Sequence, residues 1–438
     1  MADMMTLLKK IYPMRMAPVS AGLDQVVAAL CKELPFKVRE YPALKEYNGW
    51  IVPQKWEVKK AQIHKGGKLI YDGALHPLGV IGYSQSFSGK VSLEELKKHL
   101  FFTKNYPDGL VYHCDLYYKS GQKNWGFCMP LNQIESLEAG DYDVDLQTVH
   151  EKGTMKVADY FLKGKSPETI FLNAHSCHAG QANDDVAGIV VAVEVMKRLA
   201  KRKNRFSYRL IVAPEHFGTV FYLAGLSKKE LKAFKCGMFL EMLGSDTQMA
   251  LQETFTGEAE LDRAAHHYLR HAIPDHRSAP FRGIVGNDET VWEAPGYEVP
   301  TISLSRFPYP EYHSSNDTHE IIKENRLEES VLMVLGILDI LETNRPMKRK
   351  FTGLVALSNP KYDLYISTND PSIRPKVSDE QKRWNRLMDY IPRYFDGKMT
   401  VLDIAVKHDL PYADVLNYVR RFEAKGLIQF VDGKKAAR

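Results

Sequence analysis

Residues 169–188 read Thr-Ile-Phe-Leu-Asn-Ala-His-Ser-Cys-His-Ala-Gly-Gln-Ala-Asn-Asp-Asp-Val-Ala-Gly, and the order of residue types in this stretch indicates the fold. The apolar run 169–174 has the length and bulk of a buried strand. After a loop of small and polar residues, Asn183 and Asp184 precede an apolar segment, 186–200, that is long enough for a helix. Asn or Asp is favoured there because its side chain accepts hydrogen bonds from free backbone N–H groups. The stretch therefore predicts a strand, a loop and a helix that opens at Asn183-Asp184.

Two side chains of this stretch suit metal chemistry. His175 stands at the predicted strand end, and Asp184 follows nine residues later at the predicted helix start. In open α/β sheets, ligands bind at the carboxyl ends of the strands. Imidazole and carboxylate groups are ligands that zinc prefers. The pair is therefore a candidate zinc-binding site.

Composition bounds the class of protein. A chain of 438 residues with 44% hydrophobic and 26% charged residues is expected to form two or three soluble domains. No apolar run reaches the length of a membrane span, and residues 1–13 do not resemble a signal peptide. The five cysteines are scattered and form no CxxC pair, which indicates a reducing cytoplasm and no disulfide framework.

The central part of the chain alternates strands and helices, which is the signature of an α/β domain. The predicted strands are 169–174, 208–213, 238–243 and 299–304, and the predicted helices are 186–200, 219–226, 261–271 and 328–342. Residues 1–48 are expected to be mainly helical. Residues 49–145 are rich in aromatic residues, turns and short strand-like runs such as 115–118, and they predict a β-rich insert with one helix, 92–102. A strand at 144–149 is expected to return the chain to the main domain.

The last part of the chain predicts a separate small domain. A linker, 346–375, with one strand at 361–366, leads to helices 379–395, 400–408 and 412–425 and an end strand, and this order is typical of a winged helix. From Arg374 to Arg438 there are 14 Lys and Arg residues against 9 Asp and Glu residues. The predicted recognition helix nevertheless begins with few side chains able to read bases. We therefore expect a packing or oligomer contact and no nucleic-acid binding.

Further polar residues accompany the other strands of the central domain. Glu215-His216 follows the strand 208–213, and Glu241 lies within the apolar run 238–243. His313 and Asp317 follow the strand 299–304. Because the carboxyl ends of parallel strands meet at one edge, these groups are expected to converge there with His175 and Asp184.

These residues carry a family resemblance. The chain resembles the zinc-dependent aminopeptidases that include bacterial leucyl aminopeptidases and glutaminyl cyclases. More closely, it is similar to a bacterial aminopeptidase-like subgroup with a β-rich insert and a C-terminal winged helix, often linked to surface-polysaccharide gene clusters. The motif Gly49-Trp50-Ile51-Val52-Pro53 and the run Trp125-Gly126-Phe127-Cys128 support the resemblance. It implies a mixed-sheet α/β domain from 1–48 and 146–350, an insert at 49–145 and a winged helix at 376–438.

The resemblance also implies roles for individual residues. Glu215 would be the general base, and Asp317 would orient His313. Cys177 stands where the family commonly has an Asp that orients the first His, so Cys177 or the neighbouring His178 is a candidate metal contact. The implied ligands of one or two zinc ions are His175, Asp184, His216, Glu241 and His313. Candidate substrate-binding residues are Asp288, Glu289, Arg306, Tyr309 and Tyr312.

The resulting hypothesis is a cytoplasmic, zinc-dependent, aminopeptidase-like hydrolase of amide bonds that forms a homo-oligomer and binds no membrane. Its substrate would be a peptide or an amide-containing small molecule. A second hypothesis is a deacylase or amidohydrolase that acts on an amino sugar or a biosynthetic intermediate. A third, from a different class, is a non-catalytic regulator that binds a ligand or DNA.

Overall fold

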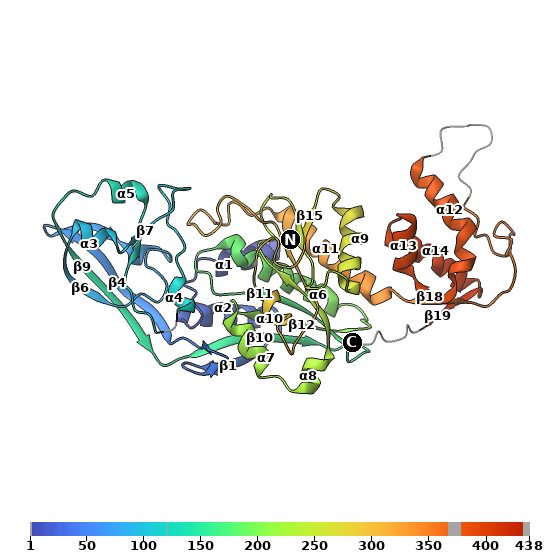
Figure 1. Cartoon of the computed structure of the whole chain (residues 1–438), viewed down its shortest axis with the longest axis horizontal. Coiled ribbons are helices and arrows are strands. Elements are labelled where there is room, and N and C mark those ends of the chain that lie inside the picture. The colour runs from blue at the N-terminus through green and yellow to red at the C-terminus, as the bar shows by residue number, and fades with distance from the viewer. Residues whose placement is uncertain (1, 120, 367–377, 432–438) are drawn as a thin grey trace. The chain divides into compact units, whose positions relative to one another are not determined.

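The computed structural model describes residues 2–119, 121–366 and 378–431. Contacts divide the chain into two compact units (Figure 1), one comprising Met1–Ala259 with His276–Leu332 and the other comprising Glu260–Asp275 with Met333–Arg438. Within the described ranges, no helix has both the length and the apolar character needed to cross a bilayer.

An eight-stranded mixed sheet forms the centre of the first unit, in the order β1-β10-β12-β11-β13-β16-β14-β15. Its middle strands β12, β11, β13 and β16 run parallel, so their carboxyl ends share one edge. The strands predicted at 169–174, 208–213 and 299–304 are confirmed to within two residues, whereas the strand predicted at 238–243 runs earlier, from Phe234 to Leu240. The bounds are β1 (Lys37–Pro42), β10 (Thr154–Leu162), β11 (Thr169–His175), β12 (Ser207–Ala213), β13 (Phe234–Leu240), β14 (Ala250–Gln252), β15 (Arg277–Ala279) and β16 (Thr301–Ser305).

Helices cover both faces of this sheet, which explains why every residue of β11 is buried. Phe171 and Asn173 share one face of β11, where Phe171 stacks on Trp292 at 3.6 Å between ring centroids and Asn173 accepts a hydrogen bond from the same indole. Alternation turns the intervening side chain to the other face, where α6 packs. The helices of this unit are α1 (Ala2–Ile11), α2 (Ala21–Glu33), α6 (Gly188–Ala200), α7 (Phe217–Ala224), α8 (Lys228–Ala233) and α10 (Glu289–Trp292), and α11 (Glu324–Thr343) begins in it.

Two strands of the main sheet differ from the prediction. Residues 1–48 were expected to be mainly helical, but their last part contains the strand β1, which pairs with β10 at the edge of the sheet. The predicted return strand 144–149 belongs instead to β9 (Asp141–Glu151), which pairs within the insert. The chain returns to the main sheet one hairpin later, through β10, which contacts β12. Alternating apolar residues identify a strand but do not identify its partner.

The insert is built on a four-stranded antiparallel sheet in the order β5-β4-β9-β6. The predicted helix 92–102 is wrong beyond its first turns, because α3 ends at Lys97 and residues 100–101 pair with residues 127–128. Residues 115–118 form a short helix, α4, and not a strand, and the Tyr117 ring packs between Tyr83 and Tyr112. The bounds are β2 (Glu46–Tyr47), β3 (Trp50–Ile51), β4 (Lys55–Lys65), β5 (Lys68–Asp72), β6 (Phe87–Ser92), α3 (Leu93–Lys97), β7 (Leu100–Phe101), α4 (Asp115–Tyr118), β8 (Phe127–Cys128) and α5 (Leu131–Glu135).

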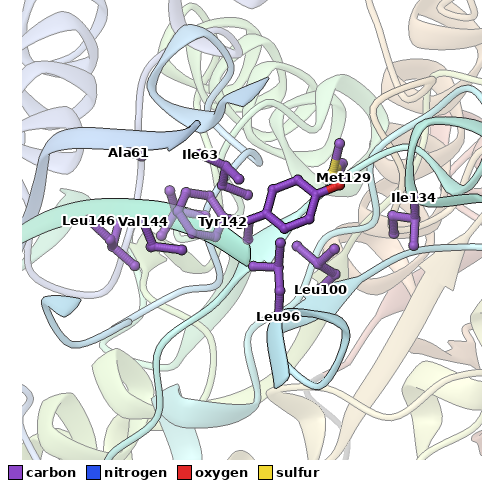
Figure 2. Close-up of a cluster of buried hydrophobic side chains, with 11 residues drawn as sticks. Ala61, Ile63, Leu96, Leu100, Met129, Ile134, Tyr142, Val144 and Leu146 are labelled. Carbon is purple, nitrogen blue, oxygen red and sulfur yellow. The ribbon is translucent and has the colours of Figure 1, made fainter. Parts of the chain in front are cut away.

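The insert has a hydrophobic core of its own, which Figure 2 shows in close-up. Side chains from β4 and β9, among them Ile63, Val144 and Leu146, meet Leu96 and Leu100 beneath the sheet. Leu146 is fully buried in this cluster. Burial of such side chains stabilises the insert by about 25 cal/mol for each Å² of apolar surface removed from water.

Substitution of a leucine in this core is expected to destabilise the protein. Leu146→Ala should lower the free energy of unfolding by about 2–5 kcal/mol, because the small side chain leaves a cavity. Leu69→Ala is the matched control, since Leu69 lies in the same sheet but is 46% exposed, and it should change stability by less than about 0.5 kcal/mol. Urea unfolding of both variants measures the difference. Equal effects would show that this cluster does not stabilise the insert.

The second unit contains the C-terminal helices and a small antiparallel sheet in the order β18-β17-β19. The three helices lie close to their predicted ranges, but the predicted strand 361–366 is wrong, and β17 forms earlier in the linker. Residues 367–377 and 432–438, which include both ends of the predicted 376–438 domain, lie outside the described residues. The bounds are α9 (Glu260–Ala272), β17 (Pro346–Arg349), α12 (Asp379–Tyr394), β18 (Asp396–Thr400), α13 (Val401–His408), α14 (Tyr412–Ala424) and β19 (Ile428–Phe430).

Candidate metal centre

A buried carboxylate, Asp184, lies between two histidines at the carboxyl edge of the main sheet. Asp184 Oδ1 is 3.0 Å from Nε2 of His175, the last residue of β11. Its other oxygen, Oδ2, is 3.1 Å from Nε2 of His313, which follows β16. Three residues far apart in the sequence therefore meet at this edge.

The turn that carries Asp184 is held by its neighbours. Residues 182–187 form an irregular helical turn before α6. Asp317 accepts hydrogen bonds from the backbone N–H groups of Asn183, at 2.7 Å, and Asp184, at 3.1 Å, while the Tyr309 hydroxyl donates to it at 2.7 Å. Asp317 therefore fixes the backbone of Asp184, whereas the sequence analysis expected it to orient His313. Burial raises the pKa of Asp317 to about 7.

Asp185, which the sequence analysis did not single out, caps α6. Its Oδ1 accepts hydrogen bonds from the N–H groups of Gly188 and Met242, each at 3.0 Å. Its Oδ2 accepts from the N–H of His175 at 3.2 Å. The predicted cap at Asn183-Asp184 is thus displaced by one residue, and this leaves the Asp184 carboxylate available to the histidines.

Glu215 comes directly after β12 and faces the same group of residues. The Tyr118 hydroxyl of the insert donates a hydrogen bond to Glu215 Oε2 at 2.6 Å. His178 Nε2 lies 3.8 Å from the same oxygen. The Glu215 N–H donates to the Cys177 sulfur at 3.3 Å, which ties the end of β12 to the loop after β11.

Burial and charge together set the protonation of the site. Burial would raise the pKa of Asp184, but His178, His175 and His313 hold it well below the usual range. Burial likewise opposes ionisation of Glu215, and the adjacent histidines still lower its pKa. Burial lowers the pKa of His178 to about 4 and raises the pKa of Cys177 to about 11. At neutral pH, two carboxylates and a neutral His178 therefore share a desolvated site.

The structure places the other two candidate ligands at the margin of this group. Glu241 follows β13 and accepts hydrogen bonds from Asn287 and Ser303, each at 3.1 Å. Burial, followed by repulsion from Glu289 and Asp185, raises its pKa well above the usual range. His216 stacks on Trp50 of the insert, with 5.9 Å between ring centroids.

The residues predicted to bind substrate are mostly engaged inside the protein. Asp288 accepts hydrogen bonds from the His216 N–H and the Thr219 hydroxyl. Glu289 accepts from Asn287 and Gln252, and the Arg306 guanidinium donates to the Thr247 carbonyl and pairs with Glu329. These side chains are buried, and their hydrogen bonds hold the loops around the group together.

Tyr309 and Tyr312, also predicted to bind substrate, lie close to the group. Tyr309 is buried and donates to Asp317, as described above. Tyr312 is only partly buried and stacks on His313, with 3.8 Å between ring centroids. Of the predicted substrate contacts, Tyr312 is therefore the best placed.

The insert supplies three aromatic side chains that sequence reasoning did not assign to the site. Tyr118 contacts Glu215, Trp50 stacks on His216, and the Tyr112 ring lies 4.6 Å from His178 and 5.1 Å from His313. Trp50 belongs to the motif at residues 49–53 that supported the family resemblance. That motif supported the family resemblance but did not predict a contact with this site.

The donor set fits a zinc ion. Asp184 Oδ2 and His313 Nε2 are 3.1 Å apart and buried, yet neither has a hydrogen-bond partner among the described residues. Buried polar atoms without partners are rare in native proteins, and a bound ion would satisfy both of these atoms. Among the described residues, two groups bring three ligand atoms within 4.8 Å of one another: His178 with Asp184 and His313, and His175 with Cys177 and His178.

Comparison with solved structures defines the class of fold. BSAP, a zinc aminopeptidase from Bacillus subtilis, matches with a TM-score of 0.56 and 14% identity over 77% of this chain and 93% of that one. The structure titled "putative peptidase" from Clostridium acetobutylicum matches with a TM-score of 0.84 and 24% identity over 98% and 96% of the two chains. The protein therefore has the mixed α/β fold of these peptidases.

Sequence comparison identifies the family. The family described as "Domain of unknown function (DUF4910)" matches residues 5–344, and the chain belongs to that family. A Clostridium acetobutylicum protein named "Putative polysaccharide biosynthesis protein with aminopeptidase-like domain" is 27% identical over 413 residues, which cover 94% of this chain and 92% of that protein.

Removal of the Asp317 carboxylate is expected to weaken metal binding. Asp317→Ala leaves the N–H groups of Asn183 and Asp184 unpaired and loosens the turn, which should lower zinc affinity by roughly 10- to 100-fold, as for other residues that support ligands. Tyr309→Phe is the graded control, because it removes one of the three hydrogen bonds to Asp317 and should have a smaller effect. Competition with a chromophoric chelator measures both affinities. Unchanged affinity in Asp317→Ala would contradict the positioning role.

Proposed function

We propose that the protein is a metal-dependent, aminopeptidase-like hydrolase of amide bonds. The observation that carries this proposal is the Asp184 carboxylate between His175 and His313, with Glu215 beside it at the same sheet edge. A buried carboxylate bridging two histidines is suited to hold one or two zinc ions. The likeness of the fold to a zinc aminopeptidase supports the same chemistry.

Two positions for metal are offered around Asp184. His175 and Asp184 would hold one ion, and Glu241 is the third candidate there because the charges of both residues influence the pKa of its carboxyl group. Asp184 and His313 would hold the other ion. His178 and His216 are the two candidates for its third protein ligand. When bound, zinc supplies a Lewis acid that polarises a carbonyl and acidifies water.

Glu215 is the proposed general base. Its lowered pKa keeps it ionised at neutral pH, so that it accepts a proton from the attacking water and passes it to the leaving amine. The Tyr118 hydroxyl holds one carboxylate oxygen and leaves the other, Oε1, available for this transfer. The partly exposed Tyr118 and Tyr312 are the groups best placed to meet a substrate.

Two kinds of amide substrate suit this site. A peptide with a free N-terminus is the simplest, by analogy with the aminopeptidase fold. The name of the Clostridium acetobutylicum relative, which refers to polysaccharide biosynthesis, favours an N-acyl or aminoacyl amino sugar as the second candidate. Aminoacyl anilides and N-acyl amino sugars, tested side by side, distinguish these two.

Replacement of the base is expected to abolish turnover without loss of metal. Glu215→Gln keeps the size of the side chain and its contact with Tyr118 but removes the proton acceptor, so kcat should fall by about 10²–10⁴-fold. Zinc content, measured by atomic absorption after purification without chelator, should match that of the wild type. Unchanged turnover would exclude Glu215 as the base.

Chelator treatment supplies the control for metal dependence. Dialysis against a chelator should remove activity, and added zinc should restore it. If the wild-type protein neither binds zinc nor hydrolyses any amide, the hydrolase proposal fails. Ligand or DNA binding by a non-catalytic regulator then becomes the leading alternative.

We infer that the C-terminal unit is a winged-helix domain that serves as a packing or oligomer contact. The order α12-β18-α13-α14-β19, with β17 completing a three-stranded sheet, supports this assignment. The exposed start of α14 carries Ala413 and Asp414 in place of the basic and amide side chains that read DNA. Contact with other copies of the chain is therefore favoured over contact with nucleic acid.

The full chain is expected to form an oligomer and to leave DNA unbound. Sedimentation equilibrium should give a mass above 50.0 kDa, the mass of one chain. A gel-shift assay with random duplex DNA should show no complex at physiological salt. A complex that weakens steeply as salt rises would instead indicate phosphate contacts and contradict this assignment.

A further inference from the structure

We propose that His178 is a metal ligand and that it, and not His216, takes the third place beside Asp184 and His313. This inference rests on the proposed metal-dependent function and specifies the ligand set of that site. It makes a site with two histidines and one carboxylate, which is a common set in catalytic zinc centres.

The distances fit a single ion. Zinc bonds to nitrogen and oxygen ligands at about 2.0–2.2 Å, so ligand atoms in a tetrahedral site lie about 3.3 Å apart. His313 Nε2 and Asp184 Oδ2 are 3.1 Å apart, and His178 Nε2 is 3.9 Å from the same oxygen. All three ligand atoms lie within 4.8 Å of one another. Small side-chain adjustments therefore suffice to close the site around an ion.

The surroundings of His178 orient its free nitrogen toward the site. Its Nδ1 lies 3.4 Å from the Cys177 sulfur, which also accepts a hydrogen bond from the Glu215 N–H. The Tyr112 ring packs against the imidazole, and the side chain is buried. With Nδ1 engaged, Nε2 is the nitrogen available for a metal, as in histidine ligands whose other nitrogen contacts a supporting group. Cys177 thus acts as the positioning residue.

His216 is placed less well for the same role. Its backbone lies in the left-handed region, with φ of 55°, and its N–H donates to Asp288. Its Nδ1 lies 3.8 Å from both Glu215 Oε1 and Asp288 Oδ1, and its ring stacks on Trp50. Among the described residues, it is not in the group that contains Asp184 and His313. His216 therefore borders the base and stays outside the ligand set.

The assignment would also leave room for water or substrate on the ion. Three protein ligands leave a fourth position of zinc free for water or substrate. Glu215 Oε2 is 3.8 Å from His178 Nε2, so the base stands at the border of this ligand set. Two imidazoles among three ligands favour zinc over magnesium or calcium, which prefer oxygen ligands.

Replacing each of the two candidate histidines, His178 and His216, by glutamine tests the proposal. His178→Gln should lose one bound zinc ion per chain, or weaken zinc by more than the roughly 10- to 100-fold that loss of a supporting residue costs. His216→Gln should retain zinc. Equilibrium dialysis with zinc alone gives stoichiometry and affinity, and circular dichroism checks that each variant is folded. Cobalt absorption spectra report the change in coordination independently of activity.

A second variant keeps the test decisive if His178→Gln does not fold. Cys177→Ser preserves volume but weakens the support of the imidazole, so zinc affinity should fall by roughly 10- to 100-fold. Cys31→Ser, at an exposed position on α2, is the matched control and should have no effect. Unchanged affinity in Cys177→Ser would overturn the positioning role, and with it the supported geometry of His178.

The remaining outcomes separate this inference from the proposed function. Loss of zinc in His216→Gln, with full zinc in His178→Gln, would assign the place to His216 and overturn the inference. Full zinc in both variants would overturn it as well. In either case, zinc-dependent hydrolysis by the wild-type protein would leave the proposed function standing. A wild-type protein that binds no zinc would remove both.

Discussion

The site depends on a carboxylate that has been taken out of water. A buried carboxylate is costly unless it is paired or bound to metal. At Asp184 the compensation comes from histidines of separate segments, His175 at the end of β11 and His313 after β16. Asp317 holds the backbone beneath it through two N–H groups, and Asp185 joins the same turn to β11 and to the end of β13. The parallel centre of the sheet is what brings these segments to one edge.

Much of this arrangement could be predicted from sequence because parallel strands impose a common direction. A buried run such as 169–174 indicates a strand with both faces covered, and the residue after it must lie at the carboxyl edge. That rule predicts the shared edge at which Asp184 contacts His175 and His313, and at which Glu215 lies near His178. The metal itself and the catalytic role of Glu215 remain proposals.

The features of the site and fold that could not be predicted from sequence depend on contacts between distant segments. Asp317 was expected beside His313, but four-residue spacing does not specify which backbone donors a carboxylate will meet. Asp185 displaced Asp184 as the cap because its oxygens reach N–H groups on two other segments. The direction of His178 could not be predicted, because a histidine in a polar loop has no fixed direction until Cys177 and Tyr112 surround it. Likewise, β9 and β10 are consecutive strands, and only their pairing distinguishes the insert from the main sheet.

The aromatic residues that the insert brings to this edge can change in evolution independently of the residues at the strand ends. Histidines and carboxylates at the strand ends are fixed by the register of the sheet, so few substitutions there are compatible with the same chemistry. Trp50, Tyr112 and Tyr118 come from a module with its own core, and their identities do not affect that register. Selection can therefore change the aromatic side chains beside this group while the strand-end residues stay constant. Relatives that share the strand-end residues but differ in these aromatics would then be expected to process different molecules with the same machinery.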